Sequence, residues 1–322
     1  MSRHIEAPEP LAAFLIYIES IQGKSPKTAD EYFYDLRTFY KFLKIKFDNA
    51  DDDFDEIDIA DVDMSYIKKV DLNLIYEYMN FLNRVRQNTP RSRARKIASL
   101  RSYFKYLHSK AKLLEVNPTA ELETIKIGKT LPVYFTLEDS LALLGGIEGK
   151  NAERDYCIIT LFLNCGMRLS ELVGINTTDI RGDRLTVVGK GNKERTIYLN
   201  AACLEAISAY MPVRNAMTPT ASDKNALFLS SRNQRISRRS VQHLVEMNVK
   251  KLGLDPRKFT THKLRHTAAT LMYQAGVDIR ALQEILGHEQ LSTTEIYTHV
   301  SNKQLKDAVS SNPLANVKKS KN

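Results

Sequence analysis

The sequence predicts a mainly α-helical protein with two domains, and three observations support this fold class. Four stretches of the N-terminal part carry apolar residues at helical spacing: 8–22, 25–47, 71–86 and 89–112. Around 117–132 the pattern breaks at two prolines and a glycine. Beyond this break, helical stretches surround one strand–turn–strand pattern. We therefore expect a four-helix domain over 1–120, a linker over 121–132, and a mixed α/β domain, mostly helical with a small antiparallel sheet, over 133–322.

Local signals indicate where helices of the first domain begin and which face they bury. Ser25 followed by Pro26 is an N-cap with proline at the first helical position, so the second helix begins there. Apolar residues also recur at helical spacing in the fourth stretch: Ile97, Leu100, Phe104 and Leu107. This spacing predicts an amphipathic helix whose apolar face is docked on the domain.

The fourth predicted helix is strongly basic. Between Arg84 and Lys112 there is no acidic residue, and the basic residues are frequent. Concentrated positive charge of this kind is typical of surfaces that bind a phosphate backbone. We expect an outward cationic face that contacts phosphates through Arg91, Arg93, Arg95, Lys96 and Arg101. An ordinary solvated face is the alternative.

The opposite charge dominates residues 48–63, which contain many aspartates and no base. A calcium-binding EF-hand loop does not fit: with Asp51 at position one, Glu56 takes the place of the required glycine and Val62 that of the closing glutamate. We expect a solvated, partly disordered connector. One hypothesis is that it repels DNA and limits non-specific binding.

The second domain opens with a helix-start signal. Thr136 precedes Glu138 and Asp139, a pattern typical of a capped N-terminus. Residues 153–165 predict a buried helix that ends near Gly166. Further helices are expected at 204–211, 237–251, 263–275 and 278–286, the last ended by Gly287.

Two short runs rich in β-branched residues, 184–188 and 195–199, predict a pair of strands. Residues 189–192 between them are typical of a hairpin connection. Lys193 then lies on or beside the turn, and we expect it to swing in when a ligand is bound.

Six residues of the second domain combine positive charge, proton transfer and one nucleophile: Arg168, Lys193, His262, Arg265, His288 and Tyr297. Two planar guanidiniums can hold both non-bridging oxygens of a phosphodiester. Histidine and lysine can move protons, and nearby positive charge favours the phenolate of a tyrosine, whose pKa is otherwise about 10. The set predicts phosphoryl transfer through a covalent phosphotyrosine, without a metal ion or other cofactor. His262 and Arg265 are three apart, so one helix face presents both.

Four sequence motifs carry these residues in a recognisable order. They are GMRLSEL with Arg168, GKGNKER with Lys193, HKLRHTAAT with His262 and Arg265, and LGHEQLSTTEIYTHV from His288 to Tyr297. Together they resemble the tyrosine recombinase (phage integrase) family, most closely its Xer-type members, over nearly the whole chain. The resemblance implies an N-terminal core-binding domain, a C-terminal catalytic domain, and site-specific recombination through a 3′-phosphotyrosyl intermediate.

The resemblance also implies individual roles. Arg168 and Arg265 clamp the phosphate, with Glu171 at the acidic position that accompanies the first arginine motif. Lys193 is the general acid toward the 5′-oxygen, and His262 is an acid or base.

Two more roles complete the set. His288 stabilises the transition state and Tyr297 is the nucleophile. We assign structural roles to the two other histidines of the region, His266 and His299. His266 follows Arg265 by one position and therefore points to another side of the helix.

The implied partner is a double-stranded DNA target site, bound by a homo- or hetero-tetramer. Residues 302–309 form a small apolar stripe that, in the family, docks into a neighbouring protomer. The implied biological role is chromosome dimer resolution. Whether a DNA translocase or a second recombinase takes part is left open by the sequence.

Composition agrees with these expectations. The formal net charge of +9 fits a polyanionic partner. No apolar window reaches the roughly 18 residues of a membrane span, and the few cysteines favour a reducing cytoplasm. Three alternatives stay open: an integrase of a mobile element, a type IB topoisomerase, and a non-catalytic architectural protein that binds DNA.

Overall fold

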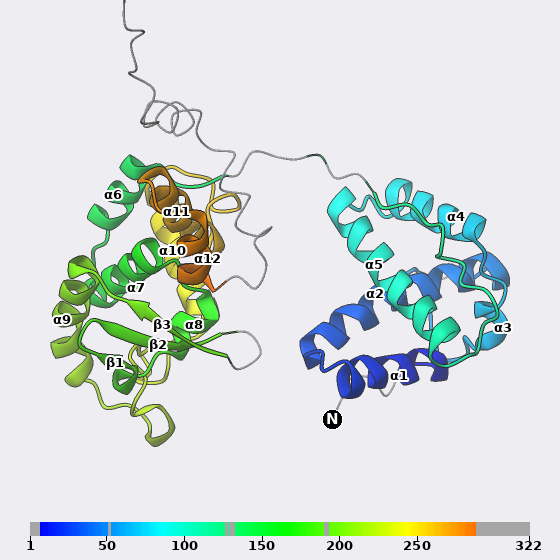
Figure 1. Ribbon diagram of the computed structural model, residues 1–322, viewed down its shortest axis with the longest axis horizontal. Coiled ribbons are helices and arrows are strands. Elements are labelled where there is room, and N and C mark those ends of the chain that lie inside the picture. The colour runs from blue at the N-terminus through cyan, green and yellow to red at the C-terminus, as the bar shows by residue number, and fades with distance from the viewer. Residues whose placement is uncertain (1–6, 51–52, 126–127, 129–132, 190–192, 288–322) are drawn as a thin grey trace, which may run out of the picture. The chain divides into compact units, whose positions relative to one another are not determined.

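The structure, a computed structural model, divides into two compact units, Met1–Thr130 and Leu131–Asn322 (Figure 1). It describes residues 7–50, 53–125, 128, 133–189 and 193–287. Each unit has its own hydrophobic core. Most of the described residues are helical, and the second unit adds a small antiparallel sheet, so the predicted fold class is confirmed. Across the described residues, no helix has the length and apolar character needed to cross a membrane.

Helices alone build the described part of the first unit: α1 (Glu9–Ile16), α2 (Pro26–Asp48), α3 (Met64–Ile67), α4 (Leu72–Arg84) and α5 (Pro90–Ser109). A π-helical turn, Tyr17–Ile21, extends α1. The four long helices are the four predicted ones, whereas α3 is too short to show a helical period. The Ser25 side chain accepts a hydrogen bond from the Thr28 amide, and Pro26 is the first residue of α2, as predicted.

The core of the first unit is rich in aromatic side chains. Phe39, Tyr40, Tyr78 and Phe104 are each fully buried. The predicted apolar face of α5 packs into this core, since its four stripe residues are all buried. Full burial of one such side chain stabilises a fold by about 1.5–3 kcal/mol, so α5 is firmly docked.

The described aspartates from 53 to 63 in the acidic segment after α2 are exposed, as expected of a solvated connector, but the segment also packs on the first unit. Three apolar side chains within it are buried: Ile57, Ile59 and Val62. The buried Lys41 side chain donates to the carbonyls of Phe54 and Asp55 at 2.8 and 2.7 Å. The sequence did not predict this packing, because the three apolar residues stand singly among carboxylates.

The described part of the second unit contains more helices: α6 (Leu137–Gly145), α7 (Ala152–Cys165), α8 (Leu169–Gly174), α9 (Ala201–Asn215), α10 (Arg238–Lys251), α11 (Thr261–Gln274) and α12 (Ile279–Leu286). Thr136 caps α6 in a reciprocal pair of hydrogen bonds with Asp139, as predicted. The predicted helix at 204–211 is longer, because α9 continues through Pro212. Helix α8 was not predicted.

The sheet of the second unit is antiparallel, in the order β1 (Ile180–Arg181), β2 (Arg184–Val188) and β3 (Glu194–Tyr198). Leu185 pairs with Ile197, which confirms the predicted hairpin. Its second strand begins one residue earlier than expected. The two-residue strand β1 was not predicted.

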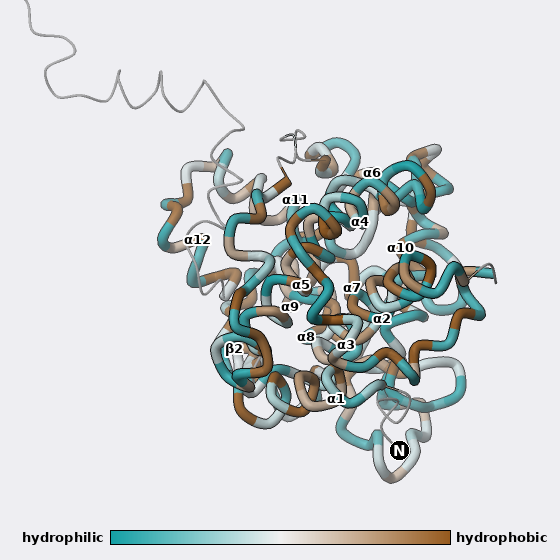
Figure 2. The backbone as a smooth tube through the Cα atoms, turned by 90° about the vertical axis from the view of Figure 1, so that its right-hand side faces the viewer, coloured by the Kyte–Doolittle hydropathy of each residue, from teal (hydrophilic) through white to brown (hydrophobic). Residues whose placement is uncertain are grey.

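Helix α7 lies at the centre of the second core. Its residues from Cys157 to Leu163 are all buried, and the helix packs on both α9 and α11. Other helices are amphipathic, as the alternation of hydrophilic and hydrophobic colours along the backbone in Figure 2 shows. Gly166 ends α7 in the left-handed conformation that favours glycine. A Cβ there would lie 2.8 Å from Cδ2 of Leu286, so α12 packs directly on this turn.

Candidate active site

A buried glutamate organises the arginines of the second unit. Glu171, in the first turn of α8, has a fully buried side chain. Its Oε1 accepts from Nη1 of Arg168 at 2.8 Å, and its Oε2 accepts from Nη2 of Arg195 at 2.9 Å. Burial alone would raise the pKa of Glu171, but the hydrogen bonds from Arg195 and Arg168 outweigh it, so the pKa lies below its ordinary value. The carboxylate is therefore charged and balanced by guanidiniums.

Arg168 and Arg265 come from different helices and meet at this carboxylate. Arg168 is the N-cap of α8, just beyond the turn that ends α7, and one third of its side chain is exposed. Arg265, on α11, is almost fully buried and lies 4.0 Å from Oε2 of Glu171. Its Nη1 donates to the carbonyl of Gly166 at 2.7 Å. The two predicted clamp residues are thus brought together.

The C-terminal end of α12 accepts hydrogen bonds from three arginines. Each donates to one of three successive carbonyls: Arg195 to Ile285, Arg265 to Leu286 at 2.6 Å, and Arg168 to Gly287 at 2.9 Å. Carbonyls in the last turn of a helix have no intrahelical partner and carry the negative end of the helix dipole. The arginines therefore satisfy the helix end while they hold it against Glu171.

Lys193 lies just before the second hairpin strand, and its carbonyl accepts from the amide of Gly189 at 2.8 Å. Its side chain is exposed. A Cβ placed on Gly189 would be 3.4 Å from Oε1 of Glu171 and 3.8 Å from Nη1 of Arg168. The base of the hairpin is therefore packed against the arginine cluster, which places the Lys193 backbone beside it.

The two histidines of α11 are in different environments. His262 is exposed in the first turn, and partial desolvation together with Arg265 and Lys263 lowers its pKa. A neutral imidazole near pH 7 is able to accept a proton. His266 is buried, with its ring edge-on to that of Tyr134, and desolvation lowers its pKa to about 4. The structure thus gives His262, and not His266, access to a substrate.

Two predicted site residues, His288 and Tyr297, lie outside the described residues, as do His299 and 302–309. The described chain ends at Gly287, which closes α12 in the left-handed conformation. His288 is the next residue in the sequence. The chain thus enters the motif that carries the tyrosine directly from the arginine cluster.

Within this part of the molecule, the charge and exposure suit an anion. Arg168 presents a partly exposed guanidinium, held in place by a buried carboxylate, and Lys193 and His262 are exposed nearby in the fold. Guanidiniums form paired hydrogen bonds with phosphate oxygens. Among the described residues, no group of histidine, cysteine and acidic side chains could hold a metal ion.

Comparison with known proteins gives the family. The model of the phage integrase family matches residues 134–304, and that of the phage integrase N-terminal SAM-like domain matches 11–111. The chain is 54% identical over 314 residues to tyrosine recombinase XerC of Caldanaerobacter subterraneus subsp. tengcongensis, covering 97% of this chain and 88% of the relative. It is 33% identical over 299 residues to XerC of Thermodesulfovibrio yellowstonii, covering 91% and 92%. The chain belongs to the phage integrase family.

Solved structures show the same fold. The XerH site-specific recombinase bound to palindromic difH substrate matches with a TM-score of 0.71 and 20% identity, covering 94% of this chain and 84% of that one. The Tn1549 transposon integrase in complex with transposon right end DNA matches with a TM-score of 0.70 and 18% identity, covering 93% and 98%. The predicted resemblance to Xer-type tyrosine recombinases is confirmed, and with it the predicted enzyme class.

The basic helix of this recombinase is less outward-facing than expected. Asp35 on α2 is buried and accepts from Nη1 of Arg95 at 2.7 Å and from Nζ of Lys96 at 3.1 Å. Lys96 itself is buried, and desolvation lowers its pKa. A buried carboxylate needs such partners because an unpaired charge is costly in the interior. The expectation that Lys96 belongs to the outward cationic face is wrong.

The other predicted DNA-binding residues differ in exposure. Arg91 is exposed, and Arg95 keeps about half of its side chain exposed while it pairs with Asp35. Arg101 donates to the carbonyl of Leu122 and to Oγ1 of Thr124. Nε of Arg93 is buried and has no hydrogen-bond partner within the described structure. Arg91 and Arg95 are therefore best placed to meet a phosphate.

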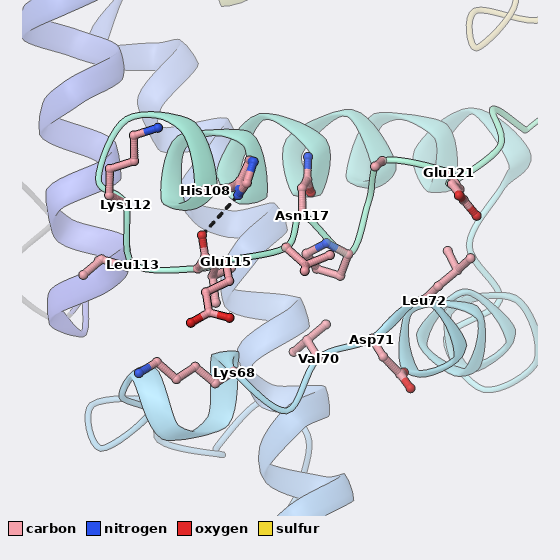
Figure 3. A pocket seen from close by; sticks show the side chains of 14 residues that line it. Lys68, Val70, Asp71, Leu72, His108, Lys112, Leu113, Glu115, Asn117 and Glu121 are labelled. Atoms are coloured by element: carbon pink, nitrogen blue, oxygen red, sulfur yellow. Dashed lines mark hydrogen bonds between the residues drawn. The ribbon is translucent and has the colours of Figure 1, made fainter.

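A large pocket lies within the first unit of the recombinase. It has a volume of about 1030 Å³ and lies between the region of Lys68 to Leu72 and the segment from His108 to Glu121 (Figure 3). His108 bridges this segment through Nδ1 and the Leu114 carbonyl at 3.1 Å. None of the four described catalytic candidates, Arg168, Lys193, His262 and Arg265, is among the residues that line it.

One functional candidate was missed by sequence reasoning. Arg195 stands in the GKGNKER motif, two residues after Lys193. Residues two apart on a strand lie on the same face, so the motif itself contained a signal that Arg195 faces the same way as the lysine.

Proposed function

We propose that this recombinase cleaves and rejoins DNA with six catalytic residues: Arg168, Lys193, His262, Arg265, His288 and Tyr297. The observation that carries this proposal is the convergence of Arg168 and Arg265 on one buried carboxylate, beside the base of the hairpin that precedes Lys193. Two guanidiniums from different helices at one place are suited to the two non-bridging oxygens of a phosphodiester.

The proposed chemistry proceeds in two transesterifications. The phenolic oxygen of Tyr297 attacks the phosphorus, the bond to the 5′-oxygen breaks, and a 3′-phosphotyrosyl link and a 5′-hydroxyl result. The proton that the 5′-oxygen needs comes from Lys193. Attack by a 5′-hydroxyl of the partner strand reverses the step and releases the tyrosine. Since the phosphodiester energy is kept in the covalent link, no nucleotide hydrolysis is required.

Proton transfer from the phenol falls to His262 in this scheme. Its lowered pKa leaves the imidazole neutral near pH 7, which is the form that accepts a proton. The guanidiniums of Arg168 and Arg265 remain charged at any working pH and stabilise the negative charge that develops on phosphorus oxygens. His288, next to Gly287, adds a further donor from the end of α12.

In this structure both clamp arginines also donate to carbonyls of α12. A guanidinium has five N–H donors, so each can keep a carbonyl partner and still contact a phosphate. The phosphate contacts the partly exposed Arg168 first and then the more deeply buried Arg265. The bound phosphate is therefore held from one side by side chains that are already fixed.

We propose a Xer-like role in chromosome dimer resolution, in the cytoplasm. The relatives that resemble the chain over most of its length are named XerC. The related fold of XerH was solved on its difH substrate, and the present chain is proposed to bind a double-stranded site in the same manner, with residues 121–132 connecting the two domains. An integrase of a mobile element is the second candidate, favoured by the fold match to the Tn1549 integrase.

Assembly into a tetramer is proposed to use the C-terminal segment 302–309, docked into a neighbouring protomer. Truncation after Val300 is then expected to leave DNA binding intact and to remove the control of which protomers cleave. Wild-type recombination by the truncated chain would contradict this arrangement. Recombination by the wild-type chain, measured with and without a DNA translocase, tests whether a translocase is needed.

The test of the function uses a duplex nicked a few nucleotides from the cleavage position, so that the short product diffuses away and the covalent complex accumulates. Wild-type protein is expected to form this complex without a divalent ion, and Tyr297→Phe to bind the DNA without forming it. Binding without a covalent complex by the wild type would favour an architectural protein. Supercoil relaxation on a plasmid with no second site would favour a topoisomerase.

A further inference from the structure

Arg195 contacts two parts of the site without belonging to the residues that handle the phosphate. Its Nη2 donates to Oε2 of Glu171 at 2.9 Å, and its Nη1 donates to the carbonyl of Ile285 near the end of α12. Only 15% of its side chain is exposed. The planar guanidinium is suited to such a bridge because its donors point in fixed, divergent directions.

The glycine at the end of α12 gives an independent indication of how closely Arg195 packs there. A Cβ on Gly287 would lie 2.8 Å from Cδ and 3.1 Å from Nε of Arg195, and the glycine has a positive φ of 62°. Both features disfavour a larger residue at this position. The stem of Arg195 therefore packs against Gly287, the residue that closes α12.

The same side chain joins three elements that carry site residues. Arg195 lies on β3, two residues beyond Lys193, and Glu171 lies on α8 beside Arg168. Helix α12 leads into the segment with His288 and Tyr297. A change in the position of this guanidinium would therefore alter the end of α12 relative to the phosphate clamp.

We propose that Arg195 is a positioning residue for DNA cleavage, which holds the end of α12 against Glu171 and so fixes the start of the segment that bears the nucleophile. This inference rests on the proposed function. Arg195 contacts the carboxylate and the helix end, and it acts on the reaction through them. Its loss is expected to slow attack by Tyr297 while DNA binding is kept.

The first measurement is the single-turnover rate of covalent complex formation on the nicked duplex at saturating protein. Arg195→Gln is expected to slow this rate by about 10- to 100-fold, the loss typical when an outer partner that orients a metal ligand is removed. Arg195→Lys is expected to lose less of this rate. An ammonium group keeps the positive charge but cannot bind both Glu171 and the Ile285 carbonyl. Arg184→Gln is the matched control, because it removes an exposed arginine from the neighbouring strand. The control is expected to react at the wild-type rate.

A second substrate separates positioning of the nucleophile from positioning of the general acid. In it, sulfur replaces the bridging 5′-oxygen, and a thiol with a pKa of about 8.5 leaves without being protonated. The Lys193→Ala variant is expected to regain its rate of covalent complex formation on this substrate, because it lacks only the general acid. Arg195→Gln is expected to stay as slow as on the oxygen substrate. Recovery of Arg195→Gln would overturn the inference and assign its effect to Lys193.

Melting temperatures complete the experiment. If Arg195→Gln cleaves at the wild-type rate, or its defect disappears when both proteins are assayed well below their melting temperatures, the residue is only structural and the inference is wrong. If Arg195→Gln does not fold, Arg195→Lys carries the same two-substrate test. Absence of any covalent complex with wild-type protein would contradict the proposed function, which is a different outcome.

Discussion

Each unit of this recombinase buries one carboxylate among several donors, and the two clusters differ in where those donors come from. The cluster in the first unit is built on Asp35, and its donors all lie on α5: Arg95, Lys96 and Ser99. The cluster in the second unit is built on Glu171, and its arginines lie on α8, β3 and α11: Arg168, Arg195 and Arg265.

A buried carboxylate thus joins two helices in the first unit, whereas in the second it joins three elements at the proposed site. The Asp35 cluster joins α2 to α5, since the partners of Lys96, Asp35 and Thr38, both lie on α2. The arginines around Glu171 each also donate to a carbonyl at the end of α12. A carboxylate whose partners extend to a further element can hold that element in register with a bound phosphate. Four predictions test this contrast.

The largest effect is expected for the partly exposed arginine of the Glu171 cluster. Arg168→Ala should slow covalent complex formation by about 100- to 1000-fold, since one donor to the developing charge is lost. Arg95→Ala removes a half-exposed arginine from the other cluster and should leave the rate on saturating DNA unchanged. Single-turnover kinetics on the nicked duplex measure both. Equal losses for the two variants would remove the contrast.

The next effect is on stability and is confined to the first cluster. Asp35→Asn should lower the free energy of unfolding by about 3 kcal/mol, because it leaves the buried Lys96 without its counter-charge. Glu77→Gln, which breaks the exposed pair with Lys46, should cost less than about 1 kcal/mol. Urea unfolding followed by circular dichroism gives both values. A cost for Asp35→Asn no larger than that for Glu77→Gln would show that the cluster contributes little.

A third effect depends on pH and belongs to the second unit. The buried His266 has a pKa of about 4 in the folded chain, against about 6.5 when unfolded. Below pH 6.5 the unfolded chain takes up the proton and the folded chain does not, so stability is lost as the pH falls from 6.5 toward 4. The loss should reach about 2 kcal/mol by pH 5.

His266→Gln should flatten this part of the stability curve, and the exposed His243→Gln should not. Urea midpoints measured between pH 5 and pH 7 provide the comparison. Parallel curves for wild type and His266→Gln would mean that the imidazole is protonated in the folded protein.

The smallest effect concerns a proposed phosphate contact on α5. Arg91→Ala should weaken binding to every DNA sequence equally and lower the slope of log affinity against log salt concentration by about 1. Lys96→Met, at a buried position of the same helix, should leave the slope unchanged. Fluorescence anisotropy over a salt series measures the slopes. A change for Lys96→Met equal to that for Arg91→Ala would place the lysine on the DNA after all.

Sequence patterns predicted the elements whose signals are local. The capped starts of α2 and α6, the glycine ends of α7 and α12, and the β2–β3 hairpin each depend on a few adjacent residues. The short elements α3, α8 and β1 were missed because each spans less than two periods of its helix or strand, which is too short for a repeating pattern. The prediction that Lys96 faces outward was wrong because α5 itself has no acidic residue. The carboxylate that pairs with the buried Lys96 comes from another helix, α2.

The candidate site shows the same limit. Residue identities and motif order were enough to select Arg168 and Arg265, but the shared role of Glu171 depends on three elements that meet only in the folded unit. The bridge made by Arg195 is a tertiary contact of the same kind. Spacing can place Arg195 on the same face as Lys193, yet it cannot reveal that the end of α12 lies against it.

The most direct test of the account is to identify the residue that becomes joined to DNA. The chain has 15 tyrosines, and the account selects one of them. After trapping on the nicked duplex, digestion of protein and DNA followed by mass spectrometry should give a single nucleotide-bearing peptide, with the phosphate on Tyr297. An adduct on any other tyrosine, or on a residue of another type, would contradict the claim that the arginine cluster directs this nucleophile.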